Sequence, residues 1–154
     1  MTTQLHGILF AYRDNPHLRE LTSHRTVASI PFGGRYRMID FMLSNMVNAG
    51  IVDIGVVMQE KCQSLLDHLG SGKDWDLARK RGGLRVLPPF TNQARNFRGK
   101  MEALYGVYSY VEDIKQDYVV MADGDVACNI ALEAVFQSHL ESGADITCVC
   151  TESG

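Results

Sequence analysis

The chain has no apolar run long enough to cross a membrane, and its N-terminus, Met-Thr-Thr-Gln-Leu-His, lacks the basic-then-apolar plan of a signal peptide. These absences predict a cytoplasmic protein with no membrane partner. Basic residues are not in excess, since 15 Lys and Arg stand against 18 Asp and Glu for a net charge of −3. With no basic excess and no exposed aromatic-basic motif, we expect no nucleic-acid partner.

Cysteine is scarce and shows no CxxC spacing among its four residues. Cys148 and Cys150 alternate in "DITCVCT", which predicts that they share one face of a strand as small core residues in a reducing compartment. Metal binding or redox chemistry is the alternative. The five histidines show no HExxH or other metal spacing, so the sequence assigns them no role.

Strand and helix patterns alternate along the chain, with no internal repeat and no linker. The patterns predict strands over 5–10, 51–59, 82–90, 117–122 and 145–150, and helices over 37–49, 63–70, 100–114 and 132–143. This alternation predicts an α/β fold, with a mostly parallel sheet covered by helices on both faces and with 117–122 as a central strand. Because the chain stops just after its last predicted strand, we expect a truncated domain cut from a longer protein.

Ligands of open parallel sheets bind beyond the carboxyl ends of the strands, and two segments place suggestive residues there. In residues 29–51, Gly33 and Gly34 allow a tight turn, and Arg37 precedes Asp40 at helical pairing distance. The plain interpretation is a turn feeding a buried helix, with Asp40 neutralised by an arginine.

The second segment, "VVMADGDVACN", places Asp123 and Asp125 just past a strand. Two carboxylates there could hold Mg²⁺ while the phosphates of a substrate complete its shell. An ordinary Asp-Gly turn is an equal alternative on these residues alone.

A basic group, Arg79, Lys80 and Arg81, precedes the predicted strand at 82–90 and is followed by Arg85. These residues could bind an anionic effector. The alternative is a solvated basic loop.

As a whole string, residues 29–51 resemble the signature of the glucose-1-phosphate adenylyltransferase (ADP-glucose pyrophosphorylase) family. The family run Pro-Phe-Gly-Gly-(Lys/Arg)-Tyr-Arg-x-Ile-Asp-Phe matches 31–41, and Leu-Ser-Asn matches 43–45. The resemblance continues through "GSGKDWDL" and "GGLRVLPPF" to Gly124-Asp125, and so spans essentially the whole chain. It implies that residues 1–154 are the N-terminal part of a Rossmann-like nucleotide-diphospho-sugar transferase domain. The rest of that domain and a left-handed β-helix are then expected in the full protein.

The resemblance also implies site residues. Catalytic relatives use Mg²⁺, and Asp125 matches a family carboxylate at the metal–phosphate centre; a second comes from later in the protein, so no cofactor is expected for this chain alone. Residues 95–108 match a loop that contacts the nucleotide sugar, but Lys100-Met101-Glu102 replace Thr-Ala-Asp after Gly99. The vestigial nucleotide-sugar cleft would comprise Tyr12, Arg13, Gly33, Gly34, Gln59 and Gly99.

The family's phosphate loop is missing. Catalytic members carry Gly-Gly-x-Gly-x-Arg-Leu after the first strand and Lys-Pro before Pro-Phe-Gly-Gly. Here residues 11–16 read Ala-Tyr-Arg-Asp-Asn-Pro, Val27 stands at the lysine position, and the arginine position falls near Pro16. Tyr12 is expected to add bulk, and Asp14 negative charge, where ATP would lie. No catalytic residue is therefore expected.

This combination resembles the regulatory D-type subunits of bacterial glycogen synthesis. It predicts a non-catalytic subunit that pairs with a catalytic subunit of the same family, which makes ADP-glucose and pyrophosphate from ATP and glucose 1-phosphate. Two alternatives stay open: a weakly active adenylyltransferase using Arg13 or Arg19, and a sensor that holds a sugar phosphate through 79–85 and Gln59. Self-association is also expected, because a fragment exposes part of its sheet.

Overall fold

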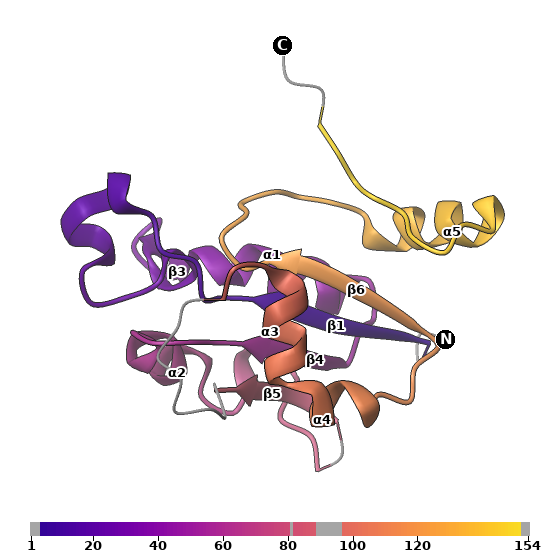
Figure 1. The fold of residues 1–154 in the computed structure, drawn as a ribbon, viewed down its shortest axis with the longest axis horizontal. Helices are drawn as coiled ribbons and strands as arrows, with labels where there is room; N and C mark the ends of the chain where they lie inside the picture. Colours follow the sequence, from indigo (N-terminus) through magenta and orange to yellow (C-terminus); the bar gives the residue numbers. More distant parts are fainter. Residues whose placement is uncertain (1–3, 81, 89–96, 152–154) are drawn as a thin grey trace.

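The computed structural model describes residues 4–80, 82–88 and 97–151. One sheet has the strand order β5-β4-β1-β6, and every neighbouring pair in it is parallel (Figure 1). Its strands are β1 (Leu5–Phe10), β4 (Asp53–Val57), β5 (Gly83–Leu87) and β6 (Tyr118–Asp123). A two-stranded antiparallel hairpin, β2 (Pro31–Phe32) and β3 (Tyr36–Arg37), stands apart from this sheet. The predicted α/β class and parallel sheet are confirmed.

The described helices lie between strands, except α5, which follows β6. They are α1 (Met38–Asn48), α2 (Gln63–Leu69), α3 (Lys100–Gly106), α4 (Tyr108–Glu112) and α5 (Leu132–Ser142), with 3-10 turns η1 (Pro16–Thr22), η2 (Val27–Ser29) and η3 (Lys73–Trp75). Within the described part of the chain, no helix is both long and apolar enough to cross a membrane.

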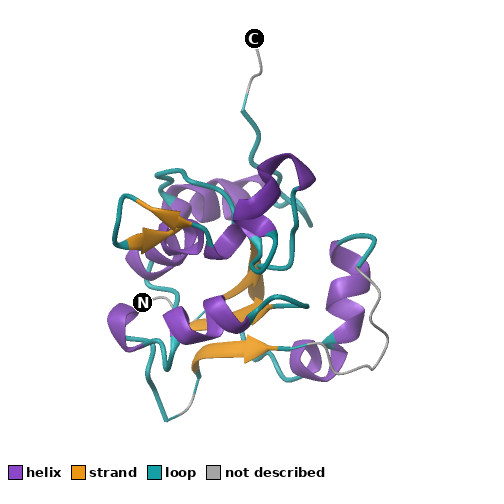
Figure 2. Ribbon diagram, turned by 90° about the vertical axis from the view of Figure 1, so that its left-hand side faces the viewer, coloured by secondary structure: helices purple, strands orange, loops and turns teal. Residues whose placement is uncertain are grey.

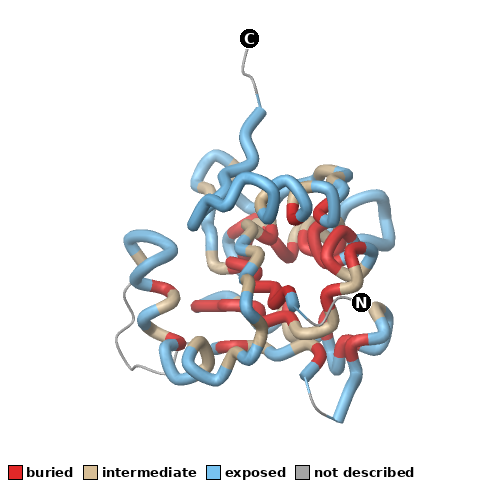
Figure 3. Tube along the Cα trace, turned by 90° about the vertical axis from the view of Figure 1, so that its right-hand side faces the viewer, coloured by how far each residue is buried: buried red, intermediate tan, exposed pale blue. Residues whose placement is uncertain are grey.

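β1 divides the core into two layers, because all six of its residues are buried and successive side chains face opposite ways. Leu5 and Leu9 lie in the larger cluster, which includes side chains of α1, α2 and α5. Ile8 and Phe10 lie in the smaller cluster, with side chains of α3. Figure 2 shows helices on both sides of the sheet, and Figure 3 shows the buried positions gathered in the middle of the molecule. The predicted cover on both faces is confirmed.

Three sequence predictions are wrong. The helix expected over 100–114 breaks at Val107, directly after Gly106, a residue that is costly inside a helix. Residues 145–150 form no strand, and both Cys148 and Cys150 are exposed. β6 lies at the end of the described sheet and not in its centre. Alternation shows which residues would share a face, but it does not supply the hydrogen-bonded neighbour that a strand needs.

Residues 29–51, the segment that resembles the family signature, are held in place by hydrogen bonds of Arg37 and Asp40. The Arg37 guanidinium donates to the Ser29 carbonyl at 2.8 Å and to the Ser64 hydroxyl at 2.6 Å. The Asp40 carboxylate accepts from the Arg37 backbone N–H at 2.9 Å and contacts Nε2 of His68 at 2.7 Å. The expectation that an arginine side chain neutralises Asp40 is therefore wrong, because the Arg37 guanidinium is used elsewhere and His68 takes that position.

The Leu-Ser-Asn part of the signature ties α1 to the segment after β6. Buried Asn45 donates through its amide nitrogen to the Cys128 carbonyl at 2.9 Å. Its amide oxygen accepts from the Ile130 N–H at 3.4 Å. Because both the nitrogen and the oxygen of this buried amide have hydrogen-bond partners, Asn45 fixes α1 relative to the segment 128–130.

Gly55 supplies a test of the packing between β4 and α4. A Cβ at Gly55 would lie 2.7 Å from Cε1 and 2.8 Å from the hydroxyl of Tyr110, so Gly55→Ala should cost about 1–3 kcal/mol of unfolding free energy. Gly99→Ala is the control, because a Cβ there meets nothing within 4 Å, and its expected loss is below about 0.5 kcal/mol. Urea unfolding measures both, and equal losses would contradict this packing.

Candidate functional site

The candidate site lies where β1, β6 and α3 meet, at the carboxyl edge of the sheet. The Ala11 N–H donates to the Val57 carbonyl at 2.9 Å, and the Gly124 N–H donates to the Phe10 carbonyl at 2.9 Å. These two bonds continue the backbone hydrogen bonding of the sheet one residue past the end of β1, on the β4 side and on the β6 side. The loop after β1 and the acidic turn after β6 therefore leave the sheet next to each other.

Two cations meet two carboxylates at this edge. The Arg13 guanidinium lies 3.8 Å from Oδ2 of Asp123 and 3.6 Å from Oδ2 of Asp125. Nζ of Lys100 donates to the same Asp123 oxygen at 2.9 Å. The other Asp125 oxygen is buried and has no hydrogen-bond partner among the described residues. The structure thus brings together Arg13 and Asp125, which the sequence singled out, with Lys100, which it noted only as a departure from the family.

Tyr12 packs into the smaller core cluster. Its ring meets Phe10 edge-on at a centroid distance of 6.1 Å and Phe97 at 5.2 Å. Burial, and then the negative charge of Asp123, raise the pKa of the Tyr12 hydroxyl. The side chain adds bulk at the end of β1, as expected; that it displaces a nucleotide stays a prediction.

An ion pair between Asp14 and Lys61 joins the loop after β1 to the loop after β4. Its carboxylate accepts from Nζ of Lys61 at 2.8 Å, and the same ammonium donates to the Thr22 carbonyl at 3.0 Å. The bond to Lys61 lowers the pKa of Asp14. The loop backbone is fixed as well, because the Val27 N–H donates to the Arg13 carbonyl at 3.1 Å. Asp14 does bring negative charge to this edge, but Lys61 offsets it.

The remaining cleft candidates are spread along the same side of the molecule. Gly33 and Gly34 form the exposed turn of the β2–β3 hairpin with φ of +60° and +79°, a conformation that favours glycine. Gln59 is buried two residues beyond β4. Gly99 precedes α3 with extended backbone, so its conformation does not require glycine.

The basic group lies at the opposite edge of the sheet. Arg79 pairs with Asp76 at 3.6 Å, Lys80 is exposed, and Arg81 lies outside the described residues. These residues lead into the start of β5, whereas Gln59 follows the end of the parallel neighbour β4. A five-residue strand spans about 16 Å, so Arg79 and Lys80 lie far along the strands from Gln59. A sugar-phosphate site made of 79–85 and Gln59 stays a prediction.

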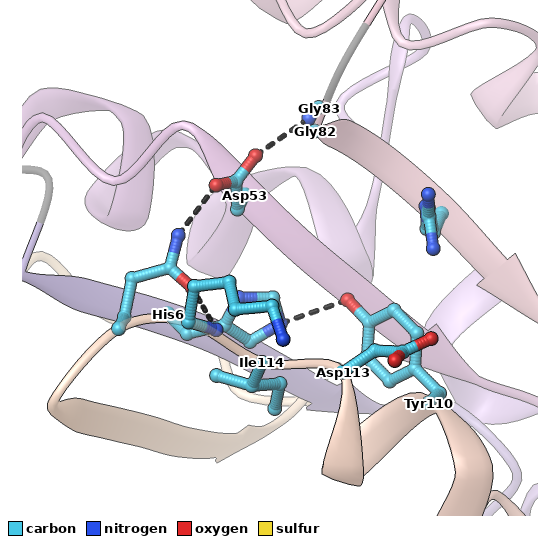
Figure 4. A pocket seen from close by; sticks show the side chains of 10 residues that line it. His6, Asp53, Gly82, Gly83, Tyr110, Asp113 and Ile114 are labelled. Carbon is cyan, nitrogen blue, oxygen red and sulfur yellow. Dashed lines mark hydrogen bonds between the residues drawn. The ribbon is translucent and has the colours of Figure 1, made fainter.

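A polar pocket opens at this amino edge, lined by His6, Asp53, Arg85, Tyr110 and Lys115 among others (Figure 4). Nε2 of His6 and the Tyr110 hydroxyl share a hydrogen bond of 2.8 Å. The Arg85 guanidinium lies over the Tyr110 ring at 5.9 Å. Burial raises the pKa of Tyr110 to about 12. Burial also lowers the pKa of His6, against the opposing effect of the Asp53 charge.

Asp53 joins this pocket to β5. Its carboxylate accepts from the Gly83 N–H at 2.8 Å and from the Gln116 amide at 2.5 Å. The carboxylate occupies the space that a Cβ at Gly82 would need, and Gly82 has a φ of +74°. Sequence reasoning missed this network, although a histidine inside the otherwise apolar strand 5–10 was a signal for it.

The sequence profile of the family described as nucleotidyl transferase matches residues 16–154. The chain is 40% identical to the glycogen biosynthesis protein GlgD of Geobacillus stearothermophilus over 96% of its own length and 43% of that relative. It is 39% identical to GlgD of Bacillus subtilis over 94% of its length and 42% of the relative. It is 36% identical to the glucose-1-phosphate adenylyltransferase of Pseudothermotoga lettingae over 95% and 35%. The chain thus spans about two fifths of the length of these relatives.

The buried His6 predicts a loss of stability in acid. Its pKa is lowered in the folded protein, so the unfolded chain binds the proton first as pH falls below about 6.5, and stability drops. The unfolding free energy should therefore fall between pH 7.5 and pH 5.5 in urea titrations. His6→Gln should reduce this fall, while His17→Gln, at an exposed position, should leave it unchanged. An unaltered fall in His6→Gln would refute the assignment.

Proposed function

This chain belongs to the nucleotidyl transferase family, and from that membership we propose that it is part of a regulatory, non-catalytic subunit of a glucose-1-phosphate adenylyltransferase in glycogen synthesis. The GlgD relatives support the role in glycogen synthesis. The adenylyltransferase relatives support the reaction of its partner. In this proposal the partner is a catalytic subunit of the same family, and the assembly is cytoplasmic.

The proposal extends to the domain organisation. Residues 1–154 form the N-terminal part of the nucleotidyltransferase domain, and the rest of that domain and a left-handed β-helix belong to the full protein. The chain covers 43% and 42% of the two GlgD proteins, so these relatives have room for further segments of this kind.

One observation carries the non-catalytic part of the proposal: the loop after β1 is closed by its own side chains. Tyr12 packs against Phe97, Arg13 reaches Asp125, and Asp14 pairs with Lys61. A loop that wraps a triphosphate needs bare backbone N–H groups and free cations directed at the anion. Here the side chains that replace the glycines are engaged in contacts within the protein.

The two missing cations predict a large loss of catalytic rate. The two cations of the family pattern, the loop arginine and the lysine replaced by Val27, would each supply a charge-assisted hydrogen bond worth about 1.5–3 kcal/mol. Losing both costs about 3–6 kcal/mol, which is about two to four decades in rate if both act in the transition state.

A weakly active enzyme is the second candidate, and one observation favours it. The Arg13 side chain is 58% exposed although it contacts two carboxylates, so its guanidinium is accessible to a phosphate. Arg19, the other candidate, lies in η1 with a φ of +44° and is also exposed.

The deciding experiment uses the full-length protein, alone and mixed with its catalytic partner, and measures ADP-glucose formed from ATP and glucose 1-phosphate. Alone, the protein should be at least a hundredfold slower than the partner. Mixed, the two should co-purify, and the partner's rate or effector response should change.

Two results would contradict the proposal. Absence of both co-purification and any kinetic change would remove the regulatory role. Turnover by the protein alone that falls in Arg13→Ala, and does not fall in the control Arg79→Ala, would establish the weak enzyme instead.

A further inference from the structure

The acidic pair at the carboxyl edge is already neutralised by the chain's own cations. We propose that Lys100 and Arg13 take the place of a divalent metal ion at Asp123 and Asp125, so that this edge of the protein works without bound Mg²⁺. The inference goes beyond the proposed function, because it concerns which cation balances the carboxylates, whatever the subunit assembles with.

Lys100 makes the decisive contact. It is the first residue of α3, and its ammonium crosses to β6 to donate to Oδ2 of Asp123 at 2.9 Å. The same ammonium lies 5.6 Å from the centroid of the Phe10 ring, the last residue of β1. The cation is thus held between the ends of the two strands, where an ion bound by Asp123 would also have to lie.

Arg13 completes the neutralisation. Its guanidinium lies within 4 Å of one oxygen of each carboxylate, 3.8 Å from Asp123 and 3.6 Å from Asp125. Both contacted oxygens are Oδ2, and the Asp123 atom is the one that already accepts from Lys100. Two carboxylates and two cations sum to zero charge, so an arriving divalent ion would meet no net attraction.

One carboxylate oxygen that could bind Mg²⁺, Oδ2 of Asp123, already accepts from Lys100. The ion requires near-octahedral oxygen ligands at about 2.0–2.1 Å and keeps several waters. Asp123 and Asp125 side chains are only 19% and 14% exposed, and the free oxygen of Asp125 is buried. Within the described part of the chain, no three His, Cys, Asp or Glu side chains gather in an arrangement that could hold a metal ion. A metal ion bound at Oδ2 of Asp123 would have to displace Lys100 from that oxygen.

The test is binding of Mn²⁺, as a probe for divalent ions, to the full-length protein, measured by the EPR signal of free Mn²⁺. Lys100→Met removes the ammonium and keeps an apolar stem beside Phe10. It should bind Mn²⁺ at least tenfold more tightly than the unmodified protein, and adding Asp123→Asn should abolish this gain. Lys115→Met is the matched control, because it removes one positive charge at the amino edge and should leave Mn²⁺ affinity unchanged.

The proposal is overturned if Lys100→Met gains no affinity while thermal unfolding shows that it is folded. It is also overturned if the unmodified protein itself binds Mn²⁺ and loses that binding in Asp123→Asn. The second measurement needs no Lys100 variant, so it decides the matter even if Lys100→Met does not fold. Neither result depends on catalytic turnover or on the partner, so failure here is distinct from failure of the proposed function.

Discussion

The structure depends on the hydrogen-bonded ladder on the two sides of β1. This strand is buried over its whole length, pairs with β4 on one side and β6 on the other, and separates the two layers of the core. These backbone hydrogen bonds continue one residue past the carboxyl end of β1 on both sides, through Ala11 and Gly124. Because both neighbours are parallel, their ends meet at one edge, and the chemistry of that edge is set by the few residues that leave it.

Those residues make contacts with one another that a nucleotide site would need to leave open. The Tyr12 ring packs against Phe97, and Lys61 neutralises Asp14. Lys100 and Arg13 neutralise Asp123 and Asp125. By contrast, the signature segment keeps its framework of hydrogen bonds through Arg37. The family scaffold is therefore retained beside an edge whose charges are satisfied internally, and this combination is the basis of the proposed non-catalytic role.

Much of the fold could be predicted from local pattern. The strand 5–10 and the helices beginning near 37, 63 and 132 are where apolar spacing placed them, because burial on one or two faces leaves a periodic trace. One error, the break in the helix expected over 100–114, has a local cause at Gly106, whereas another depends on a distant partner: residues 145–150 alternate like a strand but pair with nothing in the described sheet. Only part of the site could be predicted from the sequence, because some of its contacts join residues that are far apart in the chain. Asp125 and Arg13 could be identified, but the ion pair of Lys100 with Asp123, 23 positions apart, depends on how α3 is seated on the sheet.

The contact between Asp53 and the backbone of Gly82 and Gly83 couples positions thirty residues apart. A side chain at 82 would need the volume that the carboxylate fills and would also be held at a φ that only glycine adopts with ease. Evolutionary drift at these sites is consequently coupled. A β-carbon at residue 82 would require residue 53 to become smaller or to turn its side chain aside, so the two positions are expected to change together.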